Sequence, residues 1–470
     1  MEKVGILVVS YGSREAAMVD AFIRSRNYAV KLFVADKQRN PFNVKNAAKH
    51  VVIPNLNIDD ICKFAETNKS DIDFGIVGPE RPIIEGVRDL VEKRTGVPMI
   101  CPTKEYAIEV SKIQQRLLFQ EIVPEVNPRF KIFNPKDQKS LAEVKNAVYT
   151  WLDELRNKAV VKPDKPAAGK GVGVWGDHFT NREELFEHFL SNYEHGSVII
   201  EEKIEGEESS FQVFSDGKHL VPLPDARDYK RAFDDDKGPN TGGMGSYKNT
   251  CEALPFLTSF DYTKELEIVD KIFTKLRAKA KDASALRGVP FYVAFMHGKE
   301  PKILENNSRP GDPEIMNILP IIKDDFVDIC FRMLEGNLTH IGLEKAATVA
   351  TYKVPPNYGG YAEAFPNSVN ARESGKLVDL TKAYELGKKY GDRIRVYPGS
   401  MEQRDGETYA LKSRAVCVIG IGDSIEVARQ ISLEGINAIK GGALWNRNDI
   451  ASKQHIEKST RNMEALRHEK

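Results

Sequence analysis

The stretch KILENNSRPGDPE, residues 302–314, follows an apolar strand and carries the residue types that bind a metal ion and phosphate. Glu305 and Asn307 are two residues apart, so on a strand both side chains point to one face. A carboxylate and an amide oxygen, without histidine or cysteine, suit Mg²⁺ or Mn²⁺ that also contacts substrate phosphates. Arg309 could offset negative charge on a phosphoryl group in transfer. A solvated polar hairpin, the other interpretation, does not explain why an apolar strand leads into it.

A second stretch, VVKPDKPAAGKGVGV at residues 160–174, combines lysines with small residues. Lys162 lies inside an apolar strand, where an ammonium is costly unless it meets a phosphate or a carboxylate. The loop with Gly169, Lys170 and Gly171 has only small side chains around its lysine, which lets backbone N–H groups close over phosphates. It lacks the GxxxxGK[ST] pattern of a Walker motif. Taken alone, a flexible glycine hairpin explains this loop equally well.

Two further stretches are rich in acidic residues or glycine. VIIEEKIEGEESS ends an apolar strand with Glu201 and Glu202; its main chain could hold an adenine while Glu208 binds a ribose, although acidic loops are common and this signal alone is weak. In DARDYKRAFDDDKGPNTGGMGSY, residues 225–247, alternating charges precede a glycine-dense loop. This pattern predicts a tight loop with exposed backbone beside a polar substrate or its phosphate.

The first turn of the chain, SYGSRE, is a weaker indication of a phosphorylated ligand. Its single glycine, Gly12, does not make a GxGxxG fingerprint, so a nicotinamide-dependent dehydrogenase is disfavoured although Asp36 ends the second strand. An ordinary strand-to-helix turn explains Gly12. It does not explain the Arg14–Glu15 pair at a helix N-terminus, where backbone N–H groups favour an anion.

The elements that would position these residues begin with alternating strands and helices. Apolar strands are predicted at 4–10, 30–36, 73–80 and 97–102, with helices at 14–25 and 83–94. Such alternation indicates a doubly wound parallel sheet, whose ligands lie at the carboxyl ends of the strands. The segments SYGSRE and VGPE stand at two of those ends.

The rest of the chain predicts an α+β architecture. Helices are expected at 106–120, 182–193 and 264–280, and strands at 289–298 and 301–307. After residue 330 the pattern indicates a third region with strands at 347–356 and 413–422 and a helix at 424–439, capped by Asp423 or Ser424. The charged segment 452–470 is expected to be a loose helix or disordered.

Composition narrows the class of protein. With 68 basic and 68 acidic residues among 470, no net charge draws the chain to nucleic acid or a membrane. No apolar run is long enough to span a bilayer, and the first is too short for a secretion signal. The five cysteines include no CxxC pair, and the nine histidines form no zinc motif. These features favour a cytoplasmic metabolic enzyme that acts on small molecules.

The chain resembles the ATP-grasp ligases, and specifically the phosphoribosylamine–glycine ligase family of purine biosynthesis, in motifs that cover nearly its whole length in order: YGSRE, IVGPE, VVKPDKPAAGKGV, EEKIEGEESSF, DYKR, GPNTGGMGSY, ENNSRPGDPE, SRAV and RNDIA. GPNTGGMG and E-x-N-x-R-x-GDPE are specific to that family. The resemblance implies a Rossmann-like domain at 1–104, an ATP-grasp domain at 105–330 with a mobile lid at about 122–195, a small α+β domain at 331–451 and a charged tail at 452–470. It also implies that ATP, glycine and 5-phosphoribosylamine give glycinamide ribonucleotide, ADP and phosphate through glycyl phosphate.

The resemblance also implies roles for individual residues. The ATP contacts would be Lys112, Lys162, Gly169, Lys170 and Gly171 at the phosphates, Glu201, Glu202 and Ile204 along the adenine, and Glu208 near the ribose. Glu305 and Asn307 would ligate magnesium, and Arg309, Lys230 and Arg231 would be the catalytic groups. The pocket for glycine and phosphoribosylamine would be lined by Gly12, Arg14, Glu15, Glu80, Asp228, Asn240, Gly242, Gly243, Gly245, Asp312 and Glu314.

Several positions depart from the family pattern. Ala16 and Tyr229 stand where the family has histidine, and Pro310 where it has an aromatic residue. Pro163-Asp164-Lys165-Pro166 replaces Ala-Asp-Gly-Leu, which should stiffen the entry to the lid. These departures affect substrate contacts and leave the magnesium and phosphate groups in place.

Two alternatives stay open. The chain could be another ATP-grasp carboxylate–amine ligase with a different acid or amine. It could also be a non-catalytic nucleotide-binding regulatory protein on the same fold, although a sensor has no need of the intact Glu305, Asn307, Lys162 and Lys170. Either a monomer or a homodimer is compatible with the sequence.

Overall fold

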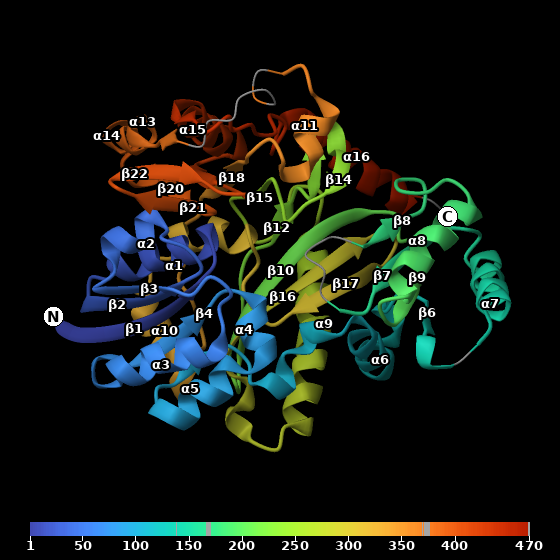
Figure 1. The fold of residues 1–470 in the computed structure, drawn as a ribbon, viewed down its shortest axis with the longest axis horizontal. Coiled ribbons are helices and arrows are strands. Elements are labelled where there is room, and N and C mark those ends of the chain that lie inside the picture. The colour runs from blue at the N-terminus through green and yellow to red at the C-terminus, as the bar shows by residue number, and fades with distance from the viewer. Residues whose placement is uncertain (138, 166–170, 369, 371–376, 469–470) are drawn as a thin grey trace.

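The first hundred residues form a five-stranded parallel sheet with helices on both faces (Figure 1). The computed structural model describes residues 1–137, 139–165, 171–368, 370 and 377–468. The strand order is β3-β2-β1-β4-β5, with β1 (Glu2–Ser10), β2 (Tyr28–Asp36), β3 (Lys49–Val52), β4 (Phe74–Val77) and β5 (Met99–Ile100). The helices are α1 (Ser13–Ile23), α2 (Pro41–Asn46), α3 (Ile58–Asn68), α4 (Glu80–Glu85) and α5 (Val87–Thr95).

Alternation along β1 shows how both faces of this sheet are covered. Ile6 and Val8 belong to the same apolar core as residues of α1, whereas Leu7 and Val9 share a core with residues of α3 and α5. A strand buried on both faces is apolar throughout, as the run at 4–10 is. The predicted doubly wound parallel sheet is therefore confirmed.

The sequence prediction was wrong about one helix of this domain and missed α2, β3 and α3. The expected helix at 83–94 is two helices, α4 and α5, which meet at Gly86. The φ of Gly86 is 96°, a left-handed conformation that glycine adopts at little cost and that ends a helix. The pattern did not predict β3, which is a short edge strand with no fully buried residue, nor α3 after it.

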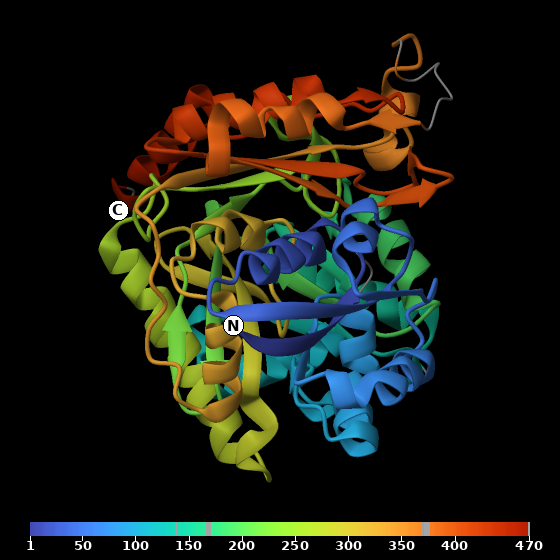
Figure 2. The same cartoon turned by 90° about the vertical axis from the view of Figure 1, so that its left-hand side faces the viewer.

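A nine-stranded sheet runs through the rest of the body, in the order β17-β16-β10-β12-β15-β18-β23-β20 with β11 beside β10 (Figure 2). Its strands are β10 (Glu207–Asp216), β11 (Leu220–Pro222), β12 (Ala226–Asp228), β15 (Gly245–Lys248), β16 (Arg287–His297), β17 (Pro301–Asn307), β18 (Ala347–Lys353), β20 (Ile394–Pro398) and β23 (Val416–Gly422). Because β15 pairs with β18, the backbone hydrogen bonds continue from the central region into the C-terminal region.

Helices and hairpins complete these two regions. The longer helices are α9 (Ser259–Lys279), α10 (Phe326–Glu335) and α15 (Ile425–Ala438), the last capped by Ser424 as predicted. The shorter elements are α11 (Tyr361–Ala364), α13 (Thr381–Glu385) and α14 (Gly387–Tyr390), with the strand pairs β13 (Arg231–Phe233) and β14 (Lys237–Asn240), β19 (Val378–Asp379) and β24 (Lys440–Gly441), and β21 (Met401–Arg404) and β22 (Glu407–Ala410).

Residues 130–202 form a four-stranded antiparallel sheet with two helices, at the right of Figure 1. This unit overlaps the lid expected at about 122–195, and we call it the lid. Its elements are β6 (Phe130–Phe133), α7 (Leu141–Glu154), β7 (Ala159–Pro163), β8 (Gly173–Val174), α8 (Arg182–Tyr193) and β9 (Val198–Glu202). Val148, Trp151 and Phe189 lie in an apolar core of its own. The preceding helix, α6 (Lys112–Ile122), starts later than predicted because two 3₁₀ turns come first and the Ser111 side chain caps it.

The C-terminal segment is a helix, α16 (Lys453–His468), which was one of the two expected outcomes, but it is packed against the body and not loose. His455, Ser459 and Met463 are buried, and Met463 belongs to the main apolar core. Among the helices of the described residues, none combines the length and the apolar character needed to cross a membrane. Four cysteines are buried, as small hydrophobic residues are, and Cys251 is exposed.

Candidate functional site

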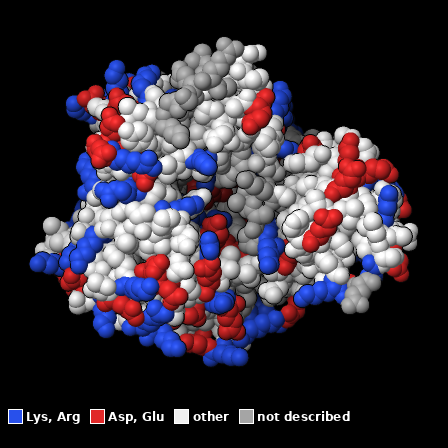
Figure 3. All heavy atoms as spheres, in the orientation of Figure 1, with Lys and Arg blue, Asp and Glu red and all other residues white. Residues whose placement is uncertain are grey.

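The predicted metal ligands lie at the end of β17. The molecular face in Figure 3 is hollowed between the lid and the body, and acidic and basic side chains meet there. Glu305 and Asn307 pair regularly with Ala294 and Tyr292 of β16, so their side chains share one face of the sheet as expected. The opposite face of the sheet packs on α9 in an apolar core that includes Ile303. Ile303 and Glu305 are two residues apart and would share a face in a regular strand, but the register shifts between them, with Leu304 as the extra residue, and this bulge separates the polar site from the core.

Glu305 is held in its ionised form. Burial acts to raise the pKa of Glu305, but Lys230, Lys112 and Lys162 outweigh burial and lower it. Asn307 is buried, and its Nδ2 has no hydrogen-bond partner among the described residues. Those residues hold no group of three or more His, Cys, Asp or Glu side chains placed to bind a metal. One ionised carboxylate and one amide fit Mg²⁺, which normally completes its ligands with water and substrate phosphates.

Lys162 and an arginine share the carboxylate of Glu201. The Nζ of Lys162 lies 2.7 Å from Oε2 of Glu201, and Arg116 donates to both carboxylate oxygens at 2.7 and 3.0 Å. Arg116 also donates to the carbonyls of Ile303 and Leu304 at 2.9 and 2.7 Å. Burial would raise the pKa of Glu201, yet Arg116 and Lys162 lower it to about 2. Sequence reasoning missed Arg116, because an arginine in an amphipathic helix gives no sign of burial.

The residues expected along an adenine lie on β9 and just after it. The side chain of Glu202 accepts from the backbone N–H and the Nε of Arg129, both at 2.9 Å. The carboxylates of Glu201 and Glu202 are therefore both engaged within the protein. Ile204, beyond the end of β9, is half-buried. A nucleotide contact at these positions would use the backbone, as the sequence suggested.

Lys112, Lys162 and Lys230 come from three parts of the chain, and the charges of all three act on Glu305. Lys230 pairs with Glu208; burial would lower the pKa of Lys230, but Glu208 and Glu305 raise it. Burial lowers the pKa of Lys112, whose Nζ donates to the Lys165 carbonyl at 3.2 Å. Of the predicted glycine loop, Gly169 and Lys170 lie outside the described residues, and Gly171 has a φ of 82°.

Residues 228–245 form a hairpin loop beside this cluster, which we call the substrate loop. Asp228 is buried, and its Oδ1 has no hydrogen-bond partner within the described part of the chain. Gly243 has a φ of 105°, and a Cβ there would lie 2.7 Å from Asp228 Oδ1, so this position requires glycine. Asn240 pairs with Arg231 across the hairpin, the Gly242 N–H donates to the Tyr358 hydroxyl at 2.9 Å, and Gly245 pairs with Thr351.

Arg231, expected to be catalytic, contacts the lid. Its Nη2 lies 2.7 Å from Oδ2 of Asp177, which follows β8, and its Nη1 donates to the Gly238 carbonyl at 2.9 Å. In this arrangement the guanidinium joins the lid to the substrate loop. An anionic substrate group would have to displace Asp177 to bind Arg231.

The first domain contributes Gly12, Arg14 and Glu15 through the start of α1. Arg14 donates from Nη1 to the Pro310 carbonyl at 3.0 Å and from Nε to Glu15 at 2.7 Å. Glu15 Oε2 accepts from the backbone N–H groups of Gly12 at 2.8 Å and Tyr11 at 3.1 Å. The pair therefore fixes the turn SYGSRE against the loop after β17, and its charges are already engaged.

Gly78 packs directly against Glu15: a Cβ there would lie 1.7 Å from Glu15 Oε1. We expect Gly78→Ala to displace Glu15 and to lower the free energy of unfolding by roughly 1–3 kcal/mol, measured by urea unfolding. Gly387→Ala is the matched control, because a Cβ at Gly387 meets nothing within 4 Å. Equal losses in the two variants would contradict this account.

Glu109 is a buried carboxylate in the site that the sequence did not reveal. Its side chain is 4% exposed, Oε1 has no partner among the described residues, and Oε2 lies 3.6 Å from Nε of Arg309. Burial raises the pKa of Glu109 to about 7, against the opposing charge of Arg309. Burial acts to raise the pKa of Glu80 also, but Arg309 and Arg14 lower it. The charge of Arg309 thus acts on two carboxylates from different parts of the chain.

The raised pKa of Glu109 predicts a dependence of stability on pH. The pKa of about 7 in the folded protein exceeds the ordinary value of 4.5, so the contribution to stability is complete below about pH 4.5 and is lost as the pH rises through 7. Between pH 4.5 and 8 we expect wild type to lose about 3 kcal/mol of unfolding free energy relative to Glu109→Gln. Urea unfolding of both proteins without metal or nucleotide measures this; parallel profiles would contradict the prediction.

The motif GDPE is fixed from both sides. Asp312 Oδ2 lies 2.8 Å from Nη2 of Arg414, whose Nη1 also donates to the Gly242 carbonyl at 2.5 Å. Glu314 accepts from Ser210 Oγ at 3.0 Å. Arg414, from the motif SRAV, therefore joins the GDPE segment to the substrate loop. Sequence reasoning noted that motif without giving Arg414 a role.

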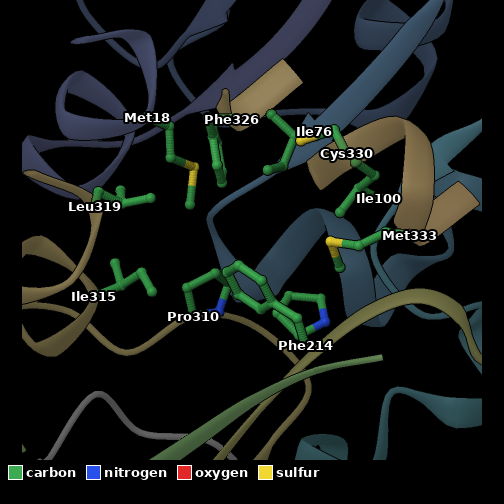
Figure 4. A pocket seen from close by; sticks show the side chains of 11 residues that line it. Met18, Ile76, Ile100, Phe214, Pro310, Ile315, Leu319, Phe326, Cys330 and Met333 are labelled. Atoms are coloured by element: carbon green, nitrogen blue, oxygen red, sulfur yellow. The ribbon is translucent and has the colours of Figure 1, made fainter. Parts of the chain in front are cut away.

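The positions that depart from the family pattern do not all face the site. Pro310 lines a small apolar cavity of about 10 Å³ between the first domain, β10 and α10, with Met18, Ile76, Phe214 and Phe326 among its other walls (Figure 4). Ala16 lies in the apolar core, and Tyr229 is buried with its ring 4.9 Å from that of His455 in α16. Asp164 accepts from Ser111 Oγ at 2.6 Å and the Ile113 N–H at 3.0 Å, which ties the lid entry to α6.

Comparison with known proteins agrees with this arrangement. Residues 4–109 match the family "Phosphoribosylglycinamide synthetase, N domain" and residues 129–315 match "Phosphoribosylglycinamide synthetase, ATP-grasp (A) domain". The phosphoribosylamine–glycine ligase of Methanocella arvoryzae is 34% identical over 98% of this chain and 99% of its own, and that of Pyrococcus furiosus is 35% identical over 99% and 98%.

A solved structure shares the fold. The crystal structure of phosphoribosylamine–glycine ligase from Thermotoga maritima superposes with a TM-score of 0.72 at 22% identity, covering 95% of this chain and 100% of its own. An ADP complex of N5-carboxyaminoimidazole ribonucleotide synthetase superposes with a TM-score of 0.60 at 14% identity over 93% of this chain and 96% of its own. Sequence relatives at full length and a shared fold lead to one conclusion: the chain belongs to the phosphoribosylamine–glycine ligase family.

Proposed function

We propose that this protein is an ATP-dependent ligase that joins glycine to 5-phosphoribosylamine in purine biosynthesis. The observation that carries the proposal is the ionised Glu305 among Lys112, Lys162, Lys230 and Arg309 at the end of a buried strand. Family membership supports the choice of substrates, since full-length relatives carry the name phosphoribosylamine–glycine ligase. The products are glycinamide ribonucleotide, ADP and phosphate.

ATP binding is assigned to the surfaces of the lid and of β17. Lys112, Lys162 and Lys170 bind the phosphates, with Gly169 and Gly171 beside them; Glu201, Glu202 and Ile204 lie along the adenine, and Glu208 near the ribose. Glu305 and Asn307 would hold Mg²⁺, or Mn²⁺ in its place. When bound, this ion would offset phosphate charge and align the oxygens that it contacts.

We propose a glycyl phosphate intermediate. A glycine carboxylate oxygen attacks the γ-phosphorus of ATP, the bond to the β–γ bridging oxygen breaks, and ADP leaves. The amine nitrogen of phosphoribosylamine then attacks the glycyl carbonyl carbon, the bond from this carbon to the phosphate oxygen breaks, and the proton lost by the amine goes to the departing phosphate. Arg309, Lys230 and Arg231 would stabilise the charge on the transferred phosphoryl group, and Arg231 would first have to release Asp177.

The remaining site residues bind glycine and phosphoribosylamine. They are Gly12, Arg14, Glu15, Glu80, Asp228, Asn240, Gly242, Gly243, Gly245, Asp312 and Glu314. Buried carboxylates such as Asp228 suit an ammonium or a hydroxyl, and the backbone N–H groups of a glycine loop suit a phosphate. The lid would exclude water from the acyl phosphate. We also propose that the enzyme is cytoplasmic and a monomer or homodimer.

The test measures ADP release with each substrate omitted in turn. We expect release to require ATP, glycine and phosphoribosylamine together with Mg²⁺. ADP release with a different acid or amine, and none with glycine, would favour another ATP-grasp ligase. Nucleotide binding without turnover under any combination would favour the non-catalytic regulatory protein.

A further inference from the structure

The motif RNDIA, residues 447–451, and helix α16 behind it contact the substrate loop. None of these C-terminal residues has a role in the proposed reaction. They nevertheless surround Tyr229 and the acidic turn at 234–236, which flank Lys230 and Arg231 in the chain. The C-terminal segment is therefore bound to the loop that carries two of the three proposed catalytic groups.

Arg447 is wholly buried and makes four hydrogen bonds. Its Nε and Nη2 bind the two oxygens of Asp449 at 2.8 and 2.6 Å. Its Nη1 donates to Asp236 Oδ1 at 3.0 Å and to the backbone carbonyl of Arg231 at 2.9 Å. Burial would raise the pKa of Asp236, but His455 and Arg447 lower it, so this carboxylate is ionised. A buried arginine thus fixes the backbone at Arg231.

His455 joins Asp236 to Tyr229. Its Nε2 lies 2.8 Å from Asp236 Oδ2, and its Nδ1 lies 3.4 Å from the Tyr229 hydroxyl. The same hydroxyl accepts from the Ala451 N–H at 2.9 Å. Burial raises the pKa of Tyr229, so the phenol keeps its proton and can donate it to His455. Each polar atom of this group then has a partner, which favours a single arrangement of the loop.

Residue alternation shows why an anchor at Tyr229 matters for the site. In extended backbone, neighbouring side chains point to opposite faces. Asp228 and Lys230 flank Tyr229: Lys230 pairs with Glu208 at the site, whereas the Tyr229 ring lies 4.9 Å from the ring of His455 on the other side. The contacts that hold Tyr229 on one side of the chain therefore also fix the direction in which Lys230 points on the other side.

We propose that Arg447 and His455 are positioning residues for the ligase: through Asp236 and Tyr229 they fix the substrate loop, and with it the side chain of Lys230 at the site and the backbone at Arg231. The kinetic test of this inference rests on the proposed function, because it measures kcat of the ligase reaction. The contacts of the same helix at its far end offer a comparison, since Arg467 binds Asp261 at 2.6 Å and not the substrate loop.

The experiment compares His455→Ala, His455→Gln and Tyr229→Phe with the control Arg467→Ala. His455→Ala removes the contacts to Asp236 and Tyr229, and Tyr229→Phe removes those to His455 and the Ala451 N–H, so we expect kcat to fall by about three- to tenfold in each variant. His455→Gln keeps a donor for Asp236 and should recover part of that loss. Arg467→Ala should keep kcat within about twofold, since an exposed ion pair contributes little. Hydrogen–deuterium exchange of residues 228–245 should rise in the two slow variants only.

Two outcomes would overturn the inference: an unchanged kcat with unchanged exchange in His455→Ala, or equal losses of kcat in His455→Ala and Arg467→Ala. If His455→Ala does not fold, Tyr229→Phe, which removes one oxygen atom, carries the test alone. An error in the proposed function can be distinguished from an error in this inference, because wild type itself would then be inactive with glycine and phosphoribosylamine. Exchange in the substrate loop would still test whether His455 holds that loop.

Discussion

Replacing Glu305 by glutamine is expected to lower kcat for ADP release by about 100- to 1000-fold. The substitution keeps the shape of the side chain and removes a negative charge that acts on Lys112, Lys162 and Lys230 together. A neutral amide is a weaker ligand for a hard divalent cation, so the metal concentration needed for half-maximal activity should also rise. Both effects are measured by steady-state ADP release over a series of MgCl₂ concentrations.

Glu300→Gln is the matched control for Glu305→Gln. Glu300 lies at the turn before β17, its side chain is 66% exposed, and it forms an ion pair with Lys264 on the surface, so the same change of charge occurs close by in sequence but away from the site. We expect its kcat to stay within about twofold of wild type. If Glu305→Gln were as active as Glu300→Gln at every metal concentration, the metal assignment would be wrong.

The periodic parts of the fold could be predicted from the sequence. The parallel sheet of the first domain follows from apolar runs that alternate with helices, and the shared face of Glu305 and Asn307 follows from their spacing. The break at Gly86 and the 3₁₀ turns before Lys112 could not be predicted in this way. They depend on a single left-handed residue and on a local cap, neither of which changes the hydrophobic period.

Charged residues outside the motifs were the part of the site that the sequence did not reveal. Arg116 and Glu109 lie in or next to ordinary helical stretches, and only the tertiary fold shows that both are buried beside predicted site residues. Arg414 differs from these, because its motif was noticed and only its contact with Asp312 was unknown. Burial of a charge depends on distant segments, so single-sequence patterns do not report it.

The packing of the charged C-terminal segment also could not be predicted from the sequence. Its composition is typical of a solvated helix or a disordered tail, yet α16 places His455 and Met463 against the body of the protein. Three buried residues in a 16-residue helix give too narrow an apolar stripe to be distinguished from chance. Tyr229 departs from the family's histidine, and the two contacts of its hydroxyl place it against this same segment.

The second large effect is expected for Arg116→Ala, which should lower the free energy of unfolding by about 3–5 kcal/mol. The substitution leaves the buried carboxylate of Glu201 with Lys162 as its remaining cation. It also removes the donors to the carbonyls of Ile303 and Leu304. Urea unfolding, compared with wild type at neutral pH, measures the loss.

Arg129→Ala is a close control, since Arg129 pairs with the adjacent Glu202 but is itself 57% exposed. An exposed pair of this kind contributes at most about 1 kcal/mol, so equal losses in the two variants would contradict the role given to burial. A double variant, Arg116→Ala with Glu201→Gln, should lose less stability than the two single losses added together, because both substitutions remove the same ion pair.

Arg116 should also affect activity, because the two carbonyls that it binds lie at an irregularity in β17. The register of β17 against β16 shifts between Ile303 and Glu305, where Leu304 is the extra residue. A bulge re-aims the side chains that follow it, and here the next residue is Glu305. Without Arg116 the bulge carbonyls lose their donors, and the carboxylate of Glu305 loses its fixed direction. We therefore expect Arg116→Ala to raise the metal requirement of the enzyme, as Glu305→Gln does, while Arg129→Ala leaves it unchanged.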